Sequence, residues 1–300
     1  MIGGCSPERL AAERAALVAL LRLGRRPWSE CREAIGQPGG ASLALERELS
    51  ETGGQRLLEP PDPSPLVAAA TRDMAAWEEA GLTLVTVLDP GYPVNLRLVH
   101  DHPPLIFVAG RLSDRDGRSV AVIGSRSASP AGLRAAGRIA RHLVEEGWTV
   151  ISGLAAGIDT AAHRATLDAG GRTLAVIGTG LERAYPAQNA SLQRLIASRH
   201  AVVSQFWPDA RPSRSSFPQR NAVMSGLARA SVVVEAGARS GARVQARIAL
   251  AHGRPVFVTE PSLSEPWIRD LAGLPGVHVA SAPSDITATL TRLHSDDLRE

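Results

Sequence analysis

The sequence predicts an α/β protein with a small helical unit at its N-terminus, followed by a doubly wound, mostly parallel sheet. From residue 83 onward, short apolar runs alternate with stretches of helical periodicity, an alternation typical of βαβ units. The runs are apolar throughout, as expected for strands covered by helices on both faces. The chain has 300 residues, 44% of them hydrophobic, which is enough for a large core and a second small domain.

The predicted elements follow from these patterns in chain order. At the N-terminus, residues 8–23 and 42–50 have helical periodicity, and the prolines between 60 and 65 indicate a stiff linker. The predicted strands are 83–88, 105–109, 119–123, 149–151, 173–177, 201–204, 231–235 and 255–258. The remaining predicted helices are 66–80, 131–146, 160–169, 187–198, 219–229, 242–252 and 284–294. The predicted domains are 1–62 (helical domain and linker), 63–262 (sheet domain) and 263–300 (tail with a helix).

Composition and charge exclude several classes of protein. No apolar run is long enough for a membrane span, and the N-terminus lacks the basic and apolar regions of a secretory signal. Cys5 and Cys31 form no CxxC motif, so we expect reduced thiols in a cytoplasmic protein. All 33 basic residues are arginines and the net charge is +3. Arginine suits phosphates and stacks on bases, provided that the side chains cluster at a site.

Small residues follow the predicted strands, at the ends that share one edge of a parallel sheet. The segments are Gly-Ser-Arg at 124–126, Ser-Gly-Leu-Ala-Ala-Gly at 152–157, Gly-Thr-Gly at 178–180 and Arg-Ser-Gly at 239–241. Backbone amides in such loops can approach a ligand closely, and helix N-termini favour anions. A phosphate-bearing ligand is therefore predicted. The alternative is that these glycines only serve chain reversal.

A second unusual segment is RPSRSSFPQRN at 211–221, in which Phe217 lies among three arginines. A basic segment with an aromatic residue suits a single nucleic-acid strand, with arginine at the backbone and phenylalanine stacked on a base. In the alternative, Phe217 packs in the core and the arginines are solvated. The P-loop, GxGxxG, HExxH and GxSxG motifs and clustered Cys/His patterns are absent from the sequence. We expect no cofactor, no metal and no catalytic residue.

Three titratable residues leave alternatives open. Asp159 and His163 are four residues apart and share one face of a predicted helix. They could form an acid–base pair, but we favour a structural role in which Asp159 stabilises the helix start and His163 bonds back to it. Glu235, beside a glycine loop, could be a general base.

The motifs together resemble the DNA processing protein A family (DprA, also called Smf). The segments AVIGSRSAS, VISGLAAGIDTAAH, TLAVIGTGLERAYPAQN, FPQRN, VVVEAGARSG and GRPVFV occur in this order, within roughly residues 89 to 258. The resemblance implies a Rossmann-like domain that binds single-stranded DNA without cofactor or catalysis. It further implies protection of DNA during natural transformation, loading of the RecA recombinase, a homodimer, and a SAM-like domain at the N-terminus.

The resemblance also implies roles for single residues. Arg126 should contact phosphate, Phe217, Arg220 and Asn221 should line the strand-binding pocket, and Ser152, Gly153 and Gly157 should shape its floor. The complete predicted DNA-binding set is Gly124, Ser125, Arg126, Ser152, Gly153, Gly157, Phe217, Arg220, Asn221, Ser240 and Gly241.

The chain departs from the family pattern in its second half. Ala242-Arg243-Val244-Gln245 stands in place of Ser-Leu-Ile-Thr, Gln205 in place of Glu, Ala222 in place of Arg, and Glu260-Pro261 in place of Pro-Gly. No winged helix is recognisable at the C-terminus. Two other functions stay open: a nucleotide phosphoribohydrolase of the LOG group and a nucleotide-signal sensor. The LOG group carries PGGxGTxxE where this chain has EAGARSGARVQA, without the glutamate.

Overall fold

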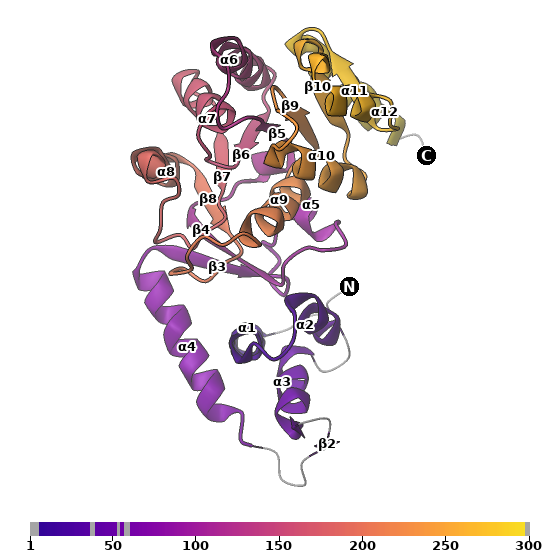
Figure 1. Ribbon diagram of the computed structural model, residues 1–300. Helices are drawn as coiled ribbons and strands as arrows, with labels where there is room; N and C mark the ends of the chain where they lie inside the picture. The colour runs from indigo at the N-terminus through magenta and orange to yellow at the C-terminus, as the bar shows by residue number, and fades with distance from the viewer. Residues whose placement is uncertain (1–5, 37–39, 53–54, 57–60, 298–300) are drawn as a thin grey trace. The chain divides into compact units, whose positions relative to one another are not determined.

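The computed structural model describes residues 6–36, 40–52, 55–56 and 61–297, and the chain forms two compact units (Figure 1). Unit 1 comprises Met1–Tyr92 and Pro103–Ile106, and unit 2 comprises Pro93–His102 and Phe107–Glu300. Cys5, Pro60 and residues 298–300 lie outside the described residues. The domain boundaries at 62 and 262 stay predictions.

Unit 1 is mainly helical. Helix α1 begins where the Ser6 hydroxyl accepts a hydrogen bond from the Arg9 amide, and it ends at Gly24, which has φ +62°. Helix α2 was not predicted, because glycine and proline on both sides of this short segment suggested a loop. The elements of unit 1 are α1 (Pro7–Leu23), α2 (Trp28–Ile35), α3 (Gly40–Ser50), β1 (Glu51–Thr52), β2 (Gln55–Arg56), α4 (Ser64–Glu79) and β3 (Leu82–Thr86).

Unit 2 has the alternating strands and helices that the sequence predicts, together with short unpredicted elements: the helices α5 and α11 and the strand β11. Its strands are β4 (Leu105–Gly110, which begins in unit 1), β5 (Ser119–Ile123), β6 (Thr149–Ser152), β7 (Thr173–Val176), β8 (Ala201–Ser204), β9 (Ala230–Val233), β10 (Val256–Thr259) and β11 (Val277–Ala280). Its α-helices are α5 (Val94–Arg97), α6 (Pro130–Glu145), α7 (Ile158–Asp168), α8 (Ala190–Arg199), α9 (Ser216–Leu227), α10 (Gly241–Ala251), α11 (Pro266–Ala272) and α12 (Pro283–Asp297).

The strands of unit 2 lie in the order β11-β10-β9-β5-β6-β7-β8-β4. Strand β4 runs antiparallel to β8, and the other neighbouring pairs are parallel. The chain moves from β5 through β6 to one side and from β9 through β10 to the other. The order therefore reverses between β5 and β9, which is where ligands bind in doubly wound sheets. The predicted fold class, a Rossmann-like doubly wound sheet, is confirmed.

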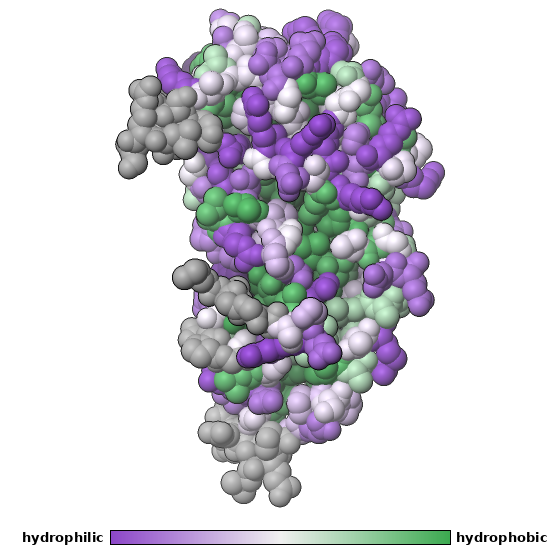
Figure 2. All heavy atoms as spheres, turned by 180° about the vertical axis from the view of Figure 1, so that it is seen from behind, coloured by the Kyte–Doolittle hydropathy of each residue, from purple (hydrophilic) through white to green (hydrophobic). Residues whose placement is uncertain are grey.

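Helices cover both faces of this sheet (Figure 1). Helices α6, α7 and α12 share one apolar cluster with β5, β6, β9 and β10, while α9 and α10 lie in front of the sheet in this view. Seen from behind, the upper part of the molecule is covered largely by hydrophilic side chains (Figure 2). Among the described residues, the structure contains no helix with both the length and the apolar character needed to cross a bilayer.

Candidate functional site

Two adjoining cavities lie at the carboxyl ends of the central strands of unit 2, and we call their shared border the rim. The large cavity has a volume of about 810 Å³ and the small cavity about 190 Å³. Residues that line both are Arg126, Ala155, Phe217 and Arg220. The large cavity lies where the loops after β5 and β9 separate, at the reversal of strand order. The predicted edge of the sheet is thus hollowed.

The Gly-Ser-Arg loop after β5 is held by backbone contacts. The Ser125 amide donates to the Glu235 carbonyl over 2.6 Å, and the Ser125 carbonyl accepts from the Ile158 amide over 3.2 Å. A side chain at Gly124 would place its Cβ 2.6 Å from both the Glu235 carbonyl oxygen and the Ile158 side chain. Glycine is therefore required for this close approach, which fixes the loop beneath the exposed Arg126.

Arg126, Phe217 and Tyr185 form a continuous series of flat groups at the rim. The Arg126 guanidinium lies 5.2 Å from the centre of the Phe217 ring, and the Phe217 and Tyr185 rings are 5.6 Å apart. Phe217 is partly buried against Gly178, whereas Tyr185 is 44% exposed. Phe217 thus packs on the protein and also borders both cavities. A cation beside aromatic faces can hold phosphate and stacked bases together.

Arg220 lies below this series and is only 6% exposed. Its Nη1 donates to the carbonyls of Gly153 (2.6 Å) and Val176 (2.9 Å), and its Nε donates to Asn221 Oδ1 (3.0 Å). Burial lowers the pKa of Arg220, against the pull of Asp159 and with the added repulsion of Arg126, yet a guanidinium stays charged in proteins. Nη2 makes no hydrogen bond with a described residue. Arg220 therefore holds the residues beneath the rim together through Nη1 and Nε. Its Nη2 is left for a ligand in the cavities that Arg220 lines.

Asp159 and His163 lie on helix α7 but do not bond to each other. The Asp159 carboxylate accepts from the amides of Gly153 (3.1 Å) and Ala155 (3.3 Å). Burial raises the pKa of Asp159, although Arg220 and these amides act in the opposite direction. The prediction that His163 bonds back to Asp159 is wrong, because its Nδ1 lies 2.7 Å from the Thr173 hydroxyl. That hydroxyl donates to the Val150 carbonyl, so it accepts from His163.

His163 is fully buried, and burial together with the field of Arg220 lowers its pKa to about 3. The ring is therefore neutral at neutral pH and out of reach of a ligand. An acid–base pair of His163 with Asp159 is not formed: Asp159 fixes the loop after β6, and His163 bonds to Thr173 at the start of β7.

Glu235 is engaged by the start of helix α6. Its carboxylate accepts hydrogen bonds from the Ser129 amide (2.8 Å) and the Ser129 hydroxyl (2.5 Å). An acidic side chain at a helix N-terminus stabilises the helix. Glu235 lies at a third cavity of about 640 Å³, outside the rim. Its contacts give it a structural role, with the side chain fixing α6 and the carbonyl fixing the Gly-Ser-Arg loop.

The N-terminus of α10 borders the large cavity on the side opposite the Gly-Ser-Arg loop. The Ser240 hydroxyl accepts from the Ala242 amide over 3.2 Å, and no heavy atom lies within 4 Å of the space that a Gly241 side chain would fill. Gln245 is 1% exposed, and neither polar atom of its amide has a hydrogen-bond partner among the described residues. This corner of the cavity contains the positive end of helix α10.

The structure brings most of the predicted residues together. Ser152 and Gly157 line neither cavity: the Ser152 hydroxyl donates to the Val122 carbonyl over 2.6 Å, and Gly157 packs under the Ser125 carbonyl. Gly153 lines the small cavity. The predicted residues that line the large cavity are Gly124, Ser125, Arg126, Phe217, Arg220, Asn221, Ser240 and Gly241. Their contact with DNA stays a prediction.

The predicted set omitted Tyr185, Arg239 and Gln245, which also line the cavities. Arg239 belongs to one of the predicted loops, but no role was given to it. Tyr185 lies in one of the quoted motifs, and its aromatic ring on a loop after a strand was the available signal. Gln245 gave a signal only as a departure from the family pattern.

Comparison with known proteins now decides the family. The sequence pattern of the DNA recombination-mediator protein A family matches residues 83–272. The chain belongs to this family. The membership that the motifs suggested is confirmed, and the matched region contains every residue that lines the two cavities.

Relatives within the DNA recombination-mediator protein A family include DNA processing protein DprA of Bacillus subtilis, 33% identical over 197 residues (65% of this chain and 66% of that protein). DprA of Streptococcus pneumoniae is 42% identical over 178 residues (59% and 63%). The X-ray structure of the pneumococcal protein matches 94% of this chain and 96% of its own, with a TM-score of 0.66 and 28% identity. DprA of Helicobacter pylori, described for its single-stranded DNA binding mode, matches 70% and 96% with a TM-score of 0.62 and 24% identity, which shows the fold. The sequence match thus spans less than two thirds of these curated relatives' full length.

Proposed function

We propose that this protein binds single-stranded DNA along the rim, protects it, and helps to load RecA recombinase onto it. The observation that carries the proposal is the series of Arg126, Phe217 and Tyr185 at the border of two cavities. Stacking of bases on aromatic side chains and contact of arginine with the backbone are the general means of binding single strands without sequence preference. A duplex keeps its bases paired and stacked, so it cannot use the aromatic faces in this way.

The electrostatics of the rim support the same proposal. Arg126 and Arg239 are exposed at the large cavity, and Arg220 adds a buried positive charge beneath them. The N-terminus of α10 adds the positive end of a helix dipole to the same cavity. Phosphates of a strand crossing the cavity would meet positive groups on both sides. The family's relative from Helicobacter pylori, described for single-stranded DNA binding, adds support from outside this molecule.

The residues that line the cavities argue against a nucleotide phosphoribohydrolase of the LOG group. Counted from Gly241, the spacing of the LOG-group segment puts Gln245 in place of its final glutamate, and an amide cannot act as a general base. Asp159 and Glu235 are engaged by backbone amides and by Ser129. No specific observation favours a nucleotide sensor. Engagement of RecA, a homodimer and a cytoplasmic location are part of the proposal by resemblance to the family.

Fluorescence anisotropy with labelled oligo-dT and a duplex of equal length tests the proposal. We expect wild type to prefer the single strand, and Arg126→Ala to weaken binding and to reduce the slope of log affinity against log salt by about 0.7, the value for one lost phosphate contact. Arg194→Ala, which removes an exposed arginine from α8, is the matched control and should bind as wild type. Equal binding by Arg126→Ala and wild type at every salt concentration would refute the assignment of the rim.

A further inference from the structure

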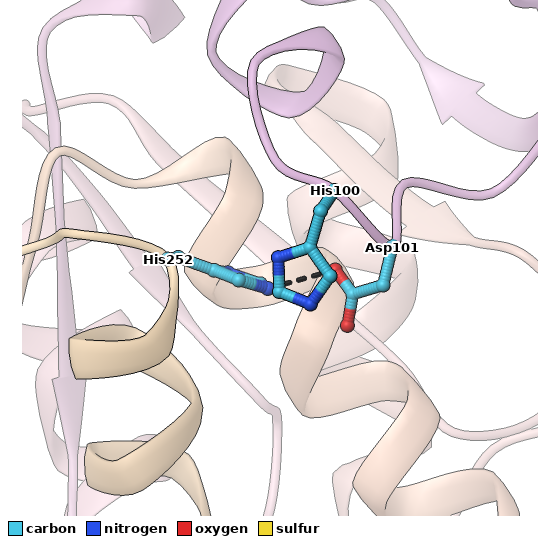
Figure 3. Close-up of side chains that lie close together, drawn as sticks. All are labelled: His100, Asp101 and His252. Atoms are coloured by element: carbon cyan, nitrogen blue, oxygen red, sulfur yellow. Dashed lines mark hydrogen bonds and ion pairs between the residues drawn. The ribbon is translucent and has the colours of Figure 1, made fainter.

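A second group of chemically active side chains lies in unit 2, outside the rim. His100 and Asp101 come from the loop after α5, and His252 comes from the turn between α10 and β10 (Figure 3). One ligand atom from each of these three side chains lies within 4.8 Å of the other two. We call this group the His-Asp-His cluster. Its members meet only in the folded chain, since His252 follows Asp101 by 151 residues.

The cluster lies at the protein surface, with His252 buried on one side and Asp101 exposed to solvent on the other. His252 Nε2 lies 2.7 Å from Asp101 Oδ1, and the His252 side chain is 1% exposed whereas that of Asp101 is 42% exposed. The His100 and His252 rings meet edge to face, with centroids 5.3 Å apart and an interplanar angle of 79°. The three polar ends converge in Figure 3 on the space beside the Asp101 carboxylate. The protein thus closes one side of this space, and solvent can reach the other.

The buried histidine is also held at its far nitrogen. His252 Nδ1 lies 3.0 Å from the hydroxyl of Ser225, a buried residue on α9. Histidines that bind metals are generally held by a hydrogen bond at the nitrogen that does not face the ion, which fixes the ring and its tautomer. Ser225 fills that position here.

We propose that the His-Asp-His cluster binds a Zn²⁺ ion. Two imidazole nitrogens and one carboxylate oxygen suit zinc, and three protein ligands leave a fourth position open for water. The ion replaces the proton between His252 Nε2 and Asp101 Oδ1. For a neutral His252 ring that proton moves to Nδ1, where it is donated to Ser225, so the hydroxyl changes from donor to acceptor and no proton is released. An imidazolium would release one proton to solvent.

Bound zinc would tie the loop after α5 to the turn before β10. Because the ligands are far apart in sequence, the unfolded chain offers no such site, and the ion stabilises the folded form. The alternative is that the same contacts serve only as an ion pair between His252 and Asp101, with His100 as an uninvolved neighbour. The two accounts differ in whether His100 matters and whether metal binds.

Zinc binding is tested on untagged protein, since a histidine tag would bind the ion itself. Competition for Zn²⁺ against a chromophoric chelator gives stoichiometry and affinity, and Co²⁺ in place of Zn²⁺ reports coordination through its visible absorption. His100→Ala and Asp101→Asn remove exposed ligands, so the fold is retained, and the amide introduced by Asp101→Asn keeps an oxygen that can accept from His252. His102→Ala is the matched control, because His102 lies close by but bonds to the Val99 carbonyl over 2.8 Å.

We expect wild type and His102→Ala to bind one equivalent of Zn²⁺ and to unfold at a higher temperature with it than with chelator. His100→Ala and Asp101→Asn should each weaken Zn²⁺ affinity by more than about tenfold, since even loss of an outer hydrogen bond costs about 10–100-fold. Absence of stoichiometric binding to wild type, or undiminished binding to both ligand variants, overturns the proposal. The readout needs no DNA, so its outcome is independent of the proposed function.

Discussion

The two edges of the parallel sheet in unit 2 hold different kinds of polar group. At the carboxyl edge, Arg126 stands on a loop that is fixed by the Glu235 carbonyl and the Ile158 amide, with Arg220 bonded to two carbonyls beneath it. At the amino edge, the His-Asp-His cluster consists of side chains that contact one another directly. At the carboxyl edge, backbone hydrogen bonds hold arginines in positions that suit an anion. At the amino edge, the side chains themselves form a group that suits a cation.

This difference shows why a buried and an exposed arginine of the same rim should respond differently to substitution. Arg220 is bonded within the protein, so its removal leaves the Gly153 and Val176 carbonyls without this donor and takes a positive charge away from the buried Asp159. Arg126 is exposed and contacts a ring. The first should act through the fold and the second through the ligand.

The largest expected effect is therefore on stability, for Arg220→Leu. We expect the free energy of unfolding, measured by urea denaturation, to fall by about 3–5 kcal/mol, because three buried acceptors lose their donor at a cost of about 1–3 kcal/mol each. Arg126→Ala should stay within about 0.5 kcal/mol of wild type, as surface substitutions do. If both variants are equally stable, Arg220 is not the internal support of the rim.

Gly157→Ala should cost less, about 1–3 kcal/mol, because its backbone has φ +77° and ψ −124° and a Cβ would overlap the Ser125 carbonyl oxygen. Gly170→Ala is the matched control, since Gly170 has φ +69° but no heavy atom within 4 Å of the added Cβ. The difference between the two variants in urea denaturation isolates the contact with the Gly-Ser-Arg loop. Gly157→Ala should also weaken oligo-dT binding, whereas Gly170→Ala should not. Equal losses of stability in both would mean that backbone conformation alone matters at Gly157.

A smaller effect is expected on the pH dependence of stability. The pKa of His163 falls from 6.5 to about 3 on folding, so between these values the unfolded chain binds a proton that the native protein does not. Stability from this group is complete above pH 6.5 and is lost as pH falls toward 3, with a slope of at most about 1.4 kcal/mol per pH unit. His163→Asn, whose amide can still donate to Thr173, should flatten the pH dependence of unfolding in this window relative to wild type. An unchanged slope would show that His163 takes up a proton in the folded protein.

The fold was largely predictable because its signals are local. Apolar runs and helical periodicity marked the strands β5 to β10 and the helices between them. The misses are short elements, α2, α5, α11 and β11. Helix α2 is flanked by Gly24, Pro27 and Gly36, and β11 (Val277–Ala280) includes a histidine and has one buried residue. Such segments take their structure from packing in three dimensions more than from their own sequence.

The two polar edges of the sheet also differ in how far local sequence predicts them. Glycines that permit close backbone approach lie in continuous motifs, so the position of the rim could be read from the sequence. The His-Asp-His cluster joins residues 151 positions apart, and no local pattern marks it. Tyr185 falls between these cases, since its motif was visible but the approach of its loop to Phe217 depends on tertiary structure.

The smallest expected effect tests whether the rim reads bases or only phosphates. Tyr185→Leu keeps an apolar side chain but removes the flat ring, so oligo-dT affinity should fall by about fivefold, or about 1 kcal/mol, at the low end of what one stacked base contributes. Stability should change by less than about 0.5 kcal/mol because Tyr185 is 44% exposed. An abasic strand of equal length is the control, since it keeps the phosphates and lacks the faces that stack. Wild type and Tyr185→Leu should bind the abasic strand equally. If the variant instead weakens both strands alike, Tyr185 acts by shaping the loop, and the carboxyl edge, like the amino edge, would hold its ligand through charge.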